Sequence, residues 1–176
     1  MGMEISFTRT GARRYAVTAG REKSARVTMD PAPGFDERLP HDLVHFVVEV
    51  HWGLRDGIFG QLDAGGDAHT FRPVDEVRTR RWARRSARRN SASGGDVGRS
   101  ELLAAVTYTA WWARHGRALP DDMADRLAAA EITDAELNGA LDRMDELSGR
   151  WRGLGVGESL TLSWPWPERA AGRRRA

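Results

Sequence analysis

Apolar and polar residues alternate with a period of two near both ends of the chain, which predicts short β-strands. The alternating segments are residues 3–10, 14–19, 25–30 and 158–164. Tight turns join the first three segments, so we expect an antiparallel meander. The last segment has no other predicted strand near it in the sequence. We therefore expect it to pair with the N-terminal strands, which would bring the chain ends together.

Between these segments, apolar residues recur every three or four positions, as on the buried face of a helix. The clearest helix spans residues 99–115 and is followed by Gly116, a residue typical of helix ends. Further helices are predicted over residues 120–130 and 133–151. The last begins with Thr-Asp-Ala-Glu, a capping-box pattern.

The most apolar helix candidate lies within residues 39–62, with the sequence LPHDLVHFVVEVHWGLRDGIFGQL. Pro40 suits the first helical position, and Gly53 suits the end of the helix. At about 100° per residue, apolar side chains cover most of the helix surface. The remaining sector is polar. It carries His41, Asp42, His45 and Glu49.

A second, shorter helix or tight corner is expected over residues 54–62, where Gly57 and Gly60 are interleaved with apolar residues. Glycine permits close packing between helices and also close approach of a ligand to the backbone. Close packing is the favoured interpretation.

Together these segments predict an α+β fold, with a small antiparallel sheet packed against about five helices. The sheet would contain three N-terminal strands and one C-terminal strand. We expect a single globular domain over residues 1–168, since 176 residues are typical of one domain. A flexible Gly/Ser-rich linker is expected near residues 90–98, and a disordered basic tail over residues 169–176.

The composition narrows the available chemistry. Cysteine is absent, so disulfides and thiolate metal sites are excluded, and a transition-metal site would need histidine and carboxylate ligands. The longest uncharged run, residues 102–113, is too short to cross a bilayer, and the N-terminus lacks a secretion-signal profile. We expect a cytoplasmic bacterial protein that does not associate with membranes. The formal net charge of +2 does not by itself mark a nucleic-acid binder.

The polar stripe of the central helix has two interpretations. The structural one, which is the commoner outcome, is a solvent face or a simple buried hydrogen bond between His45 and Glu49. The functional one is a metal or proton-transfer site. Although the chain has 27 basic Lys and Arg residues, none lies between Arg38 and Arg55. An ordinary exposed face in so arginine-rich a chain would carry some arginine, which favours the functional interpretation.

The segment HDLVH, which starts at His41, resembles the HExxH helix of the zincin metallopeptidases, with Asp in place of Glu. The resemblance implies that His41 and His45 bind zinc or another divalent metal and that Asp42 is the general base. Glu49 or His69 would complete the metal ligands. Aspartate is one methylene shorter than glutamate, and no further ligand signature of that family follows. The longer string LPHDLVHFVVE resembles bacterial proteins of uncharacterised function, which implies no activity.

The sequence of residues 74–89 predicts a helix that has few apolar residues and many arginines around Trp82. One interpretation is contact with nucleic acid or another polyanion such as an acidic protein. The other is a solvated helix whose arginines pair with acids elsewhere. The arginines expected to make the polyanion contact are Arg78, Arg81, Arg85 and Arg88.

Two functions therefore follow from the sequence. The more specific is a divalent-metal-binding domain with a His/carboxylate site that would support hydrolysis. The alternative is a non-enzymatic interaction module that uses the arginine-rich helix. The sequence does not decide whether the protein is an enzyme, because it does not show whether His41 and His45 face solvent, the core or a cleft.

Overall fold

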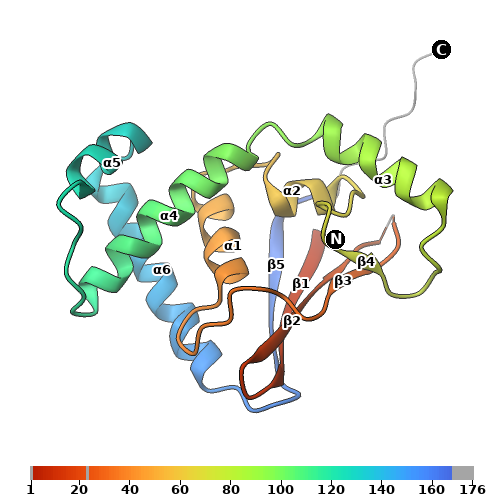
Figure 1. The fold of residues 1–176 in the computed structure, drawn as a ribbon, viewed down its shortest axis with the longest axis horizontal. Coiled ribbons are helices and arrows are strands. Elements are labelled where there is room, and N and C mark those ends of the chain that lie inside the picture. Colours follow the sequence, from red (N-terminus) through yellow and green to blue (C-terminus); the bar gives the residue numbers. More distant parts are fainter. Residues whose placement is uncertain (1, 23, 168–176) are drawn as a thin grey trace.

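The computed structural model describes residues 2–22 and 24–167, and these form five strands and six helices in an α+β arrangement (Figure 1). The predicted fold class is confirmed. The strands lie in one sheet in the order β4-β3-β2-β1-β5, and all neighbouring pairs are antiparallel. The strands are β1 (Gly2–Gly11), β2 (Arg14–Gly20), β3 (Val27–Met29), β4 (Arg72–Pro73) and β5 (Ser159–Pro167).

The helices follow the predicted order along the chain. They are α1 (His41–His51), α2 (Ile58–Asp63), α3 (Arg80–Ala92), α4 (Val97–Arg114), α5 (Met123–Ala130) and α6 (Asp134–Arg152). The capping box at the start of α6 is confirmed, because the Thr133 side chain accepts from the Glu136 N–H and Glu136 accepts from the Thr133 N–H. Within the described part of the chain, no helix combines the length and the hydrophobicity that crossing a membrane requires.

The sheet has four strands from the N-terminal half of the chain, so the predicted number of three is corrected. The additional strand, β4, places Pro73 opposite Val27 and Arg72 opposite Thr28 of β3. Two residues are too few to show a period of two, and their pairing depends on a chain segment more than forty positions away. The sequence pattern could not reveal this strand.

The predicted pairing of the C-terminal strand with the N-terminal strands is confirmed. β5 runs antiparallel to β1, with Gly2 opposite Pro167 and Phe7 opposite Leu160. Segments from opposite ends of the chain therefore lie side by side, and β1 is enclosed by β2 and β5 (Figure 1).

The core lies between the sheet and the helices. Alternate residues of β1, β2 and β5 are buried on one face, and α1 packs between this face and helices α4 and α6 (Figure 1). Phe46 of α1 contacts the rings of Phe59 and Trp164 at centroid distances of 5.4 and 6.1 Å. Because α1 is enclosed by neighbours, residues 42–49 are all buried, including its polar members.

Helix α3 and the segment after it differ in extent from the predicted helix and linker. α3 begins at Arg80 rather than at residue 74, because the Thr79 side chain caps it by accepting from the Trp82 N–H. It continues to Ala92, so only residues 93–96 separate it from α4. The Asp96 carboxylate accepts from the N–H of residue 56, which ties this segment to the turn before α2. The basic tail expected over residues 169–176 lies outside the described residues.

Candidate metal centre

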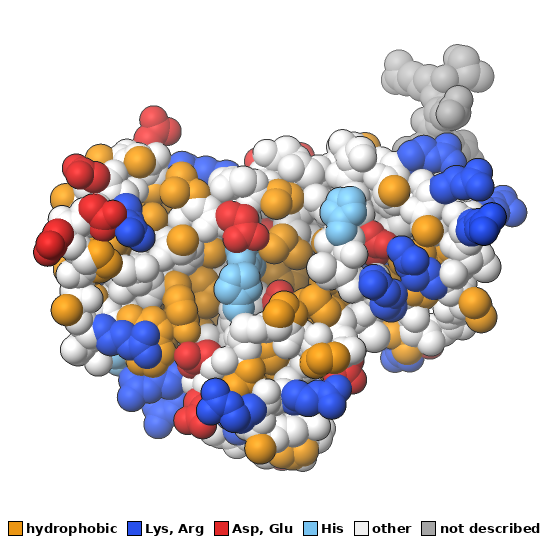
Figure 2. Space-filling model, in the orientation of Figure 1, with side chains coloured by type: hydrophobic (Ala, Val, Ile, Leu, Met, Phe, Trp, Pro, Cys, Tyr) orange, Lys and Arg blue, Asp and Glu red, His pale blue; other side chains and the backbone are white. Residues whose placement is uncertain are grey.

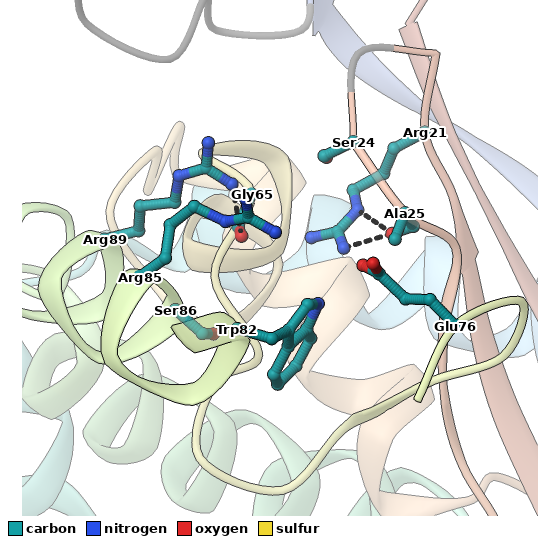
Figure 3. A pocket seen from close by; sticks show the side chains of 9 residues that line it. All are labelled: Arg21, Ser24, Ala25, Gly65, Glu76, Trp82, Arg85, Ser86 and Arg89. Atoms are coloured by element: carbon teal, nitrogen blue, oxygen red, sulfur yellow. Dashed lines mark hydrogen bonds between the residues drawn. The ribbon is translucent and has the colours of Figure 1, made fainter. Parts of the chain in front are cut away.

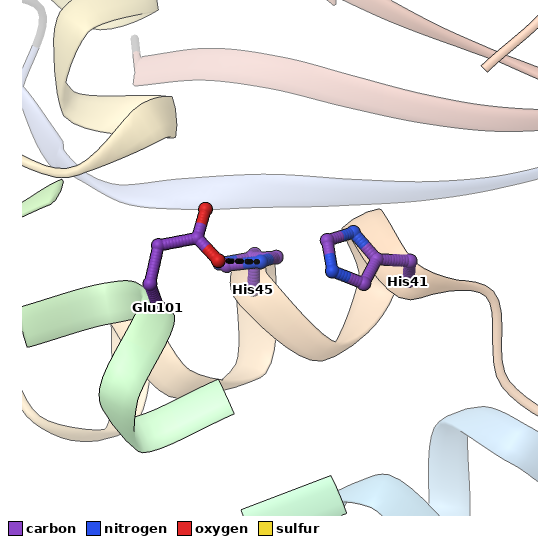
Figure 4. A group of neighbouring side chains, drawn as sticks. All are labelled: His41, His45 and Glu101. Atoms are coloured by element: carbon purple, nitrogen blue, oxygen red, sulfur yellow. Dashed lines mark ion pairs between the residues drawn. The ribbon is translucent and has the colours of Figure 1, made fainter. Parts of the chain in front are cut away.

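His41 and His45 lie one turn apart on α1, on the side of that helix that faces the start of α4 (Figure 4). Their ring centroids are 4.6 Å apart. His41 is exposed, whereas His45 is fully buried. The polar stripe of α1 therefore runs from the protein surface into the interior. It is neither a fully exposed face nor a fully buried one.

While Glu49 is ionised, a chain of hydrogen bonds sets the tautomer of the His45 ring. Its Nδ1 lies 2.9 Å from the Ser100 hydroxyl, which donates to Glu49 Oε1 over 2.9 Å. A serine hydroxyl has a single proton. When the Ser100 hydroxyl donates its hydrogen bond to ionised Glu49, its oxygen must accept the hydrogen bond from His45. The Nδ1 atom then carries the ring proton, and Nε2 carries a lone pair.

Glu49 connects this chain to the start of α2. Its Oε1 accepts from the Ile58 N–H at 2.7 Å, and its Oε2 accepts from the Phe59 N–H at 2.9 Å. These bonds favour the charged carboxylate, but burial of the side chain outweighs them and raises the pKa of Glu49 to about 7. Gly57 makes the arrangement feasible, because a Cβ there would lie 2.4 Å from Glu49 Oε1. The group that approaches the backbone closely at Gly57 is thus the Glu49 side chain.

On its outer side, His45 faces Glu101 of α4. The distance from His45 Nε2 to Glu101 Oε2 is 3.7 Å, and Nε2 has no hydrogen-bond partner among the described residues. Burial and the neighbouring charge of His41 lower the pKa of His45 to about 3, so its ring is neutral near pH 7. Both facing atoms are electron-pair donors. A shared cation would stabilise such a pair.

Three side chains offer ligand atoms at this point. One atom each from His41, His45 and Glu101 lies within 4.8 Å of the other two (Figure 4). In a tetrahedral zinc site, bonds of about 2.0–2.2 Å place neighbouring ligand atoms about 3.4 Å apart. The separation of His45 and Glu101 is already close to that value. His41 and Glu101 are exposed, so rotation of their side chains can supply the remaining displacement.

A hollow of about 90 Å³ adjoins His41 and Glu101. Its wall contains His41, Val44, Glu101, Ala104, Ala105 and Tyr108. The space-filling view shows a histidine next to an acidic side chain near the middle of this face (Figure 2). A water molecule takes about 30 Å³ in the liquid, so the hollow has room for a water and a small polar group.

The other residues predicted for the site lie elsewhere. Asp42 is buried and accepts a hydrogen bond from the Tyr15 hydroxyl, and burial raises its pKa. Among the described residues that line the hollow, Asp42 is absent. His69 is exposed in a turn with left-handed backbone (φ 64°) and does not join the cluster. Glu49 lies behind His45, with its oxygens bonded to Ser100 and to α2.

Glu101 was not identified from the sequence. It follows a predicted helix start and looks like an ordinary residue of a solvent face, and it is 56 positions from His45 along the chain. Only the packing of α4 against α1 places it beside the histidines. The structure therefore brings together the two predicted histidines with one carboxylate that no local pattern marked.

The four arginines expected to contact a polyanion lie on or near α3, and basic side chains gather over this end of the molecule (Figure 2). Arg78 precedes the helix and stacks over the Trp82 ring at 6.0 Å. Arg88 bonds back to the Arg84 carbonyl. Within the described residues, none of Arg78, Arg81, Arg85 and Arg88 forms an ion pair with an acid. The solvated-helix interpretation expected these arginines to pair with acids elsewhere in the chain, and among the described residues they do not.

No protein family model, curated protein or solved structure matches this chain. The functional proposal therefore rests on the geometry and the chemistry of the site.

Proposed function

We propose that this protein binds a divalent transition metal ion, zinc in the first place, through His41, His45 and Glu101. The observation that supports the proposal most strongly is the buried Nε2 of neutral His45, which has no hydrogen-bond partner among the described residues and lies 3.7 Å from the Glu101 carboxylate. Two histidines and one glutamate form an established ligand set for zinc in sites that keep one position open.

The hydrogen bonds behind His45 suit this role. Histidines that bind metals usually donate their second ring N–H to a carboxylate, a carbonyl or water, and this bond sets the tautomer and the ring orientation. Here the Ser100 hydroxyl accepts that hydrogen bond from His45 and donates its own hydrogen bond to Glu49. When Glu49 is ionised, its negative charge increases the electron density at Nε2, which strengthens a bond to a cation.

Three protein ligands leave a fourth tetrahedral position, which would open toward the hollow beside His41 and Tyr108. A metal ion bound there would supply a Lewis acid and a water of lowered pKa, which is the chemistry of metal-assisted hydrolysis. The apolar wall formed by Val44, Ala104 and Ala105 would limit access of bulk water to that position. Hydrolysis of a small substrate is therefore the reaction class that we assign to the site.

The test is the metal content of protein purified without chelator, followed by zinc titration of the metal-free form. The informative variants are His41→Ala, His45→Ala and Glu101→Gln. His51→Ala is the matched control, because His51 lies in the last turn of the same helix, outside the cluster. His41 and Glu101 are exposed, so their substitution should leave the fold intact, and loss of metal in these variants cannot be attributed to unfolding.

We expect about one zinc ion per chain in the wild type and in His51→Ala, and loss of most of it in the three ligand variants. Zinc should also raise the melting temperature of the wild type, since a ligand that binds only the folded state stabilises it. Equal metal content in His45→Ala and wild type, or a melting temperature that excess zinc leaves unchanged, would overturn the proposal.

A further inference from the structure

A second polar pocket, of about 150 Å³, lies between α3 and the turn that joins β2 to β3 (Figure 3). It shares no residue with the candidate metal centre. Arg85 and Arg89 extend into it from successive turns of α3, and Arg21 extends into it from the opposite side, beyond the end of β2 (Figure 3). The Trp82 side chain forms part of its wall, and Glu76 contributes a carboxylate on the side of Arg21 (Figure 3).

The α3 side of this pocket is positively charged. Arg85 and Arg89 line it there, whereas the Glu76 carboxylate lies on the side of Arg21, whose guanidinium donates to the carbonyls of Ala25, Leu62 and Gly66. The Arg85 guanidinium has neither a hydrogen bond nor an ion pair with any described residue. Burial and the charge of Arg85 lower the pKa of Arg89, which donates to the neutral carbonyl of Gly65 at 3.0 Å. An anion held between Arg85 and Arg89 would relieve their repulsion.

Ser86 provides an independent observation. Its side chain is only 2% exposed, it lines the pocket, and its Oγ has no hydrogen-bond partner within residues 2–22 and 24–167. A serine inside a helix commonly donates to the carbonyl four residues earlier, and Ser91 of the same helix does so. A buried hydroxyl without a hydrogen-bond partner costs free energy, so its presence in the pocket wall points to a ligand that accepts a hydrogen bond from it.

We propose that this pocket binds the phosphate group of a phosphorylated ligand. A phosphate monoester carries close to two negative charges near neutral pH, which matches the two positive charges of Arg85 and Arg89. Guanidinium groups donate in a fork that fits phosphate oxygens, and Ser86 would supply one more donor. The same chemistry serves a phosphorylated metabolite and a nucleic-acid phosphate, and a recessed pocket with Arg21 and Arg89 half-buried favours a terminal phosphate.

The test is calorimetric titration of the full chain with inorganic phosphate at physiological chloride concentration. EDTA is present throughout, so that phosphate binding does not report on the metal centre. Ser86→Ala is the sharpest variant, because the Oγ makes no hydrogen bond that its removal would break. We expect about tenfold weaker phosphate binding with an unchanged or higher melting temperature, and a larger loss in Arg85→Gln. Arg81→Gln, on the same helix but outside the pocket, should stay within about twofold of the wild type.

Absence of binding at millimolar phosphate would overturn the proposal, and so would equal weakening in Arg81→Gln and Arg85→Gln, which would indicate a diffuse basic surface. A sugar phosphate and a single-stranded oligonucleotide distinguish the two sources. Tighter binding of the sugar phosphate than of phosphate itself would identify a metabolite. Oligonucleotide binding that phosphate displaces and that Ser86→Ala weakens would identify a nucleic-acid phosphate in the same pocket.

Discussion

The charge of Glu49 depends strongly on the surroundings of its side chain in this fold. This side chain is fully buried, yet it accepts hydrogen bonds from Ser100 and from backbone N–H groups at the start of α2, those of Ile58 and Phe59 among them. The donors stabilise the carboxylate, and burial destabilises it by more, so the pKa rises to about 7. The side chain thus titrates in a range where an ordinary glutamate is fully ionised.

This raised pKa predicts a pH-dependent stability. The folded protein holds a proton on Glu49 more tightly than the unfolded chain does. The favourable contribution of Glu49 to the free energy of unfolding is therefore fully present below about pH 4.5 and is lost as the pH rises through about 7. Relative to Glu49→Gln, the free energy of unfolding of the wild type should fall by about 3 kcal/mol over this range.

Urea unfolding of the two proteins at a series of pH values measures this difference. The comparison cancels groups that both proteins share. His45, which Ser100 links to Glu49, contributes in the opposite direction, because its lowered pKa makes its contribution present above about pH 6.5 and lost as the pH falls. A difference between wild type and variant that does not change with pH would contradict the assignment of the titration to Glu49.

Ser100 tests whether the hydrogen bonds behind His45 serve the metal. Ser100→Ala leaves the Nδ1–H of His45 without its acceptor, so the ring loses its fixed tautomer and orientation. We expect the zinc affinity to fall about 10- to 100-fold, as is typical when a partner of a ligating histidine is removed. Titration against a competing chelator measures this, with Ser91→Ala as an exposed serine control. An unchanged affinity would show that packing alone orients the ring.

At the scale of elements, α2 depends on a side chain from another helix. It has only six residues, too few to be stable in isolation, and its N-cap residue Gly57 offers no side-chain oxygen. The carboxylate of Glu49 takes over that function by accepting from the first N–H groups of α2. The same carboxylate thereby connects the candidate metal centre to the position of α2.

Gly57→Ala should therefore destabilise the protein. The added Cβ would lie 2.4 Å from Glu49 Oε1, and displacing the carboxylate breaks hydrogen bonds to a charged group. We expect a loss of about 2–4 kcal/mol in the free energy of unfolding, measured by denaturant titration. In Gly149→Ala, the new Cβ meets no neighbouring atom within 4 Å inside α6, so this control should be neutral or stabilised by about 1 kcal/mol. Similar stability of the two variants would contradict the capping role of Glu49.

At the scale of the whole molecule, the sheet joins the two ends of the chain. β5 covers β1 along its length and places Leu160, Leu162 and Trp164 in the core. Each buried apolar side chain of this size contributes about 1.5–3 kcal/mol, so the three together are comparable with the 5–15 kcal/mol by which a domain is stable.

A chain that ends at Gly157 should lose cooperative folding, because β1 becomes an unpaired edge and the core loses one wall. A chain that ends at Pro167 keeps every pairing of β5 and should melt close to the full-length protein. Thermal unfolding followed by circular dichroism compares the two. A cooperative transition in the chain that ends at Gly157, within a few degrees of the control, would contradict the role of β5.

Local patterns determined much of this architecture. A period of two identified the longer strands, a helical period identified the helices, and the capping box marked the start of α6. The four-residue spacing of His41 and His45 placed them on one side of α1. These features follow from interactions between residues close in the chain, which is why the sequence alone predicted them. The start of α3 and the two-residue strand β4 were missed, because a single cap and a long-range pairing decide them.

Tertiary structure alone decided the chemistry of the site. Glu101 rather than Glu49 or His69 lies beside the histidines because α4 packs against α1, and no local pattern encodes that contact. The pKa values of His45 and Glu49 move in opposite directions from their usual values because burial disfavours the charged form of each. The arginine pocket likewise combines α3 with a turn of the sheet. Burial and the proximity of charges are properties of the packed chain, whereas the periodicity of its elements is already present in the sequence.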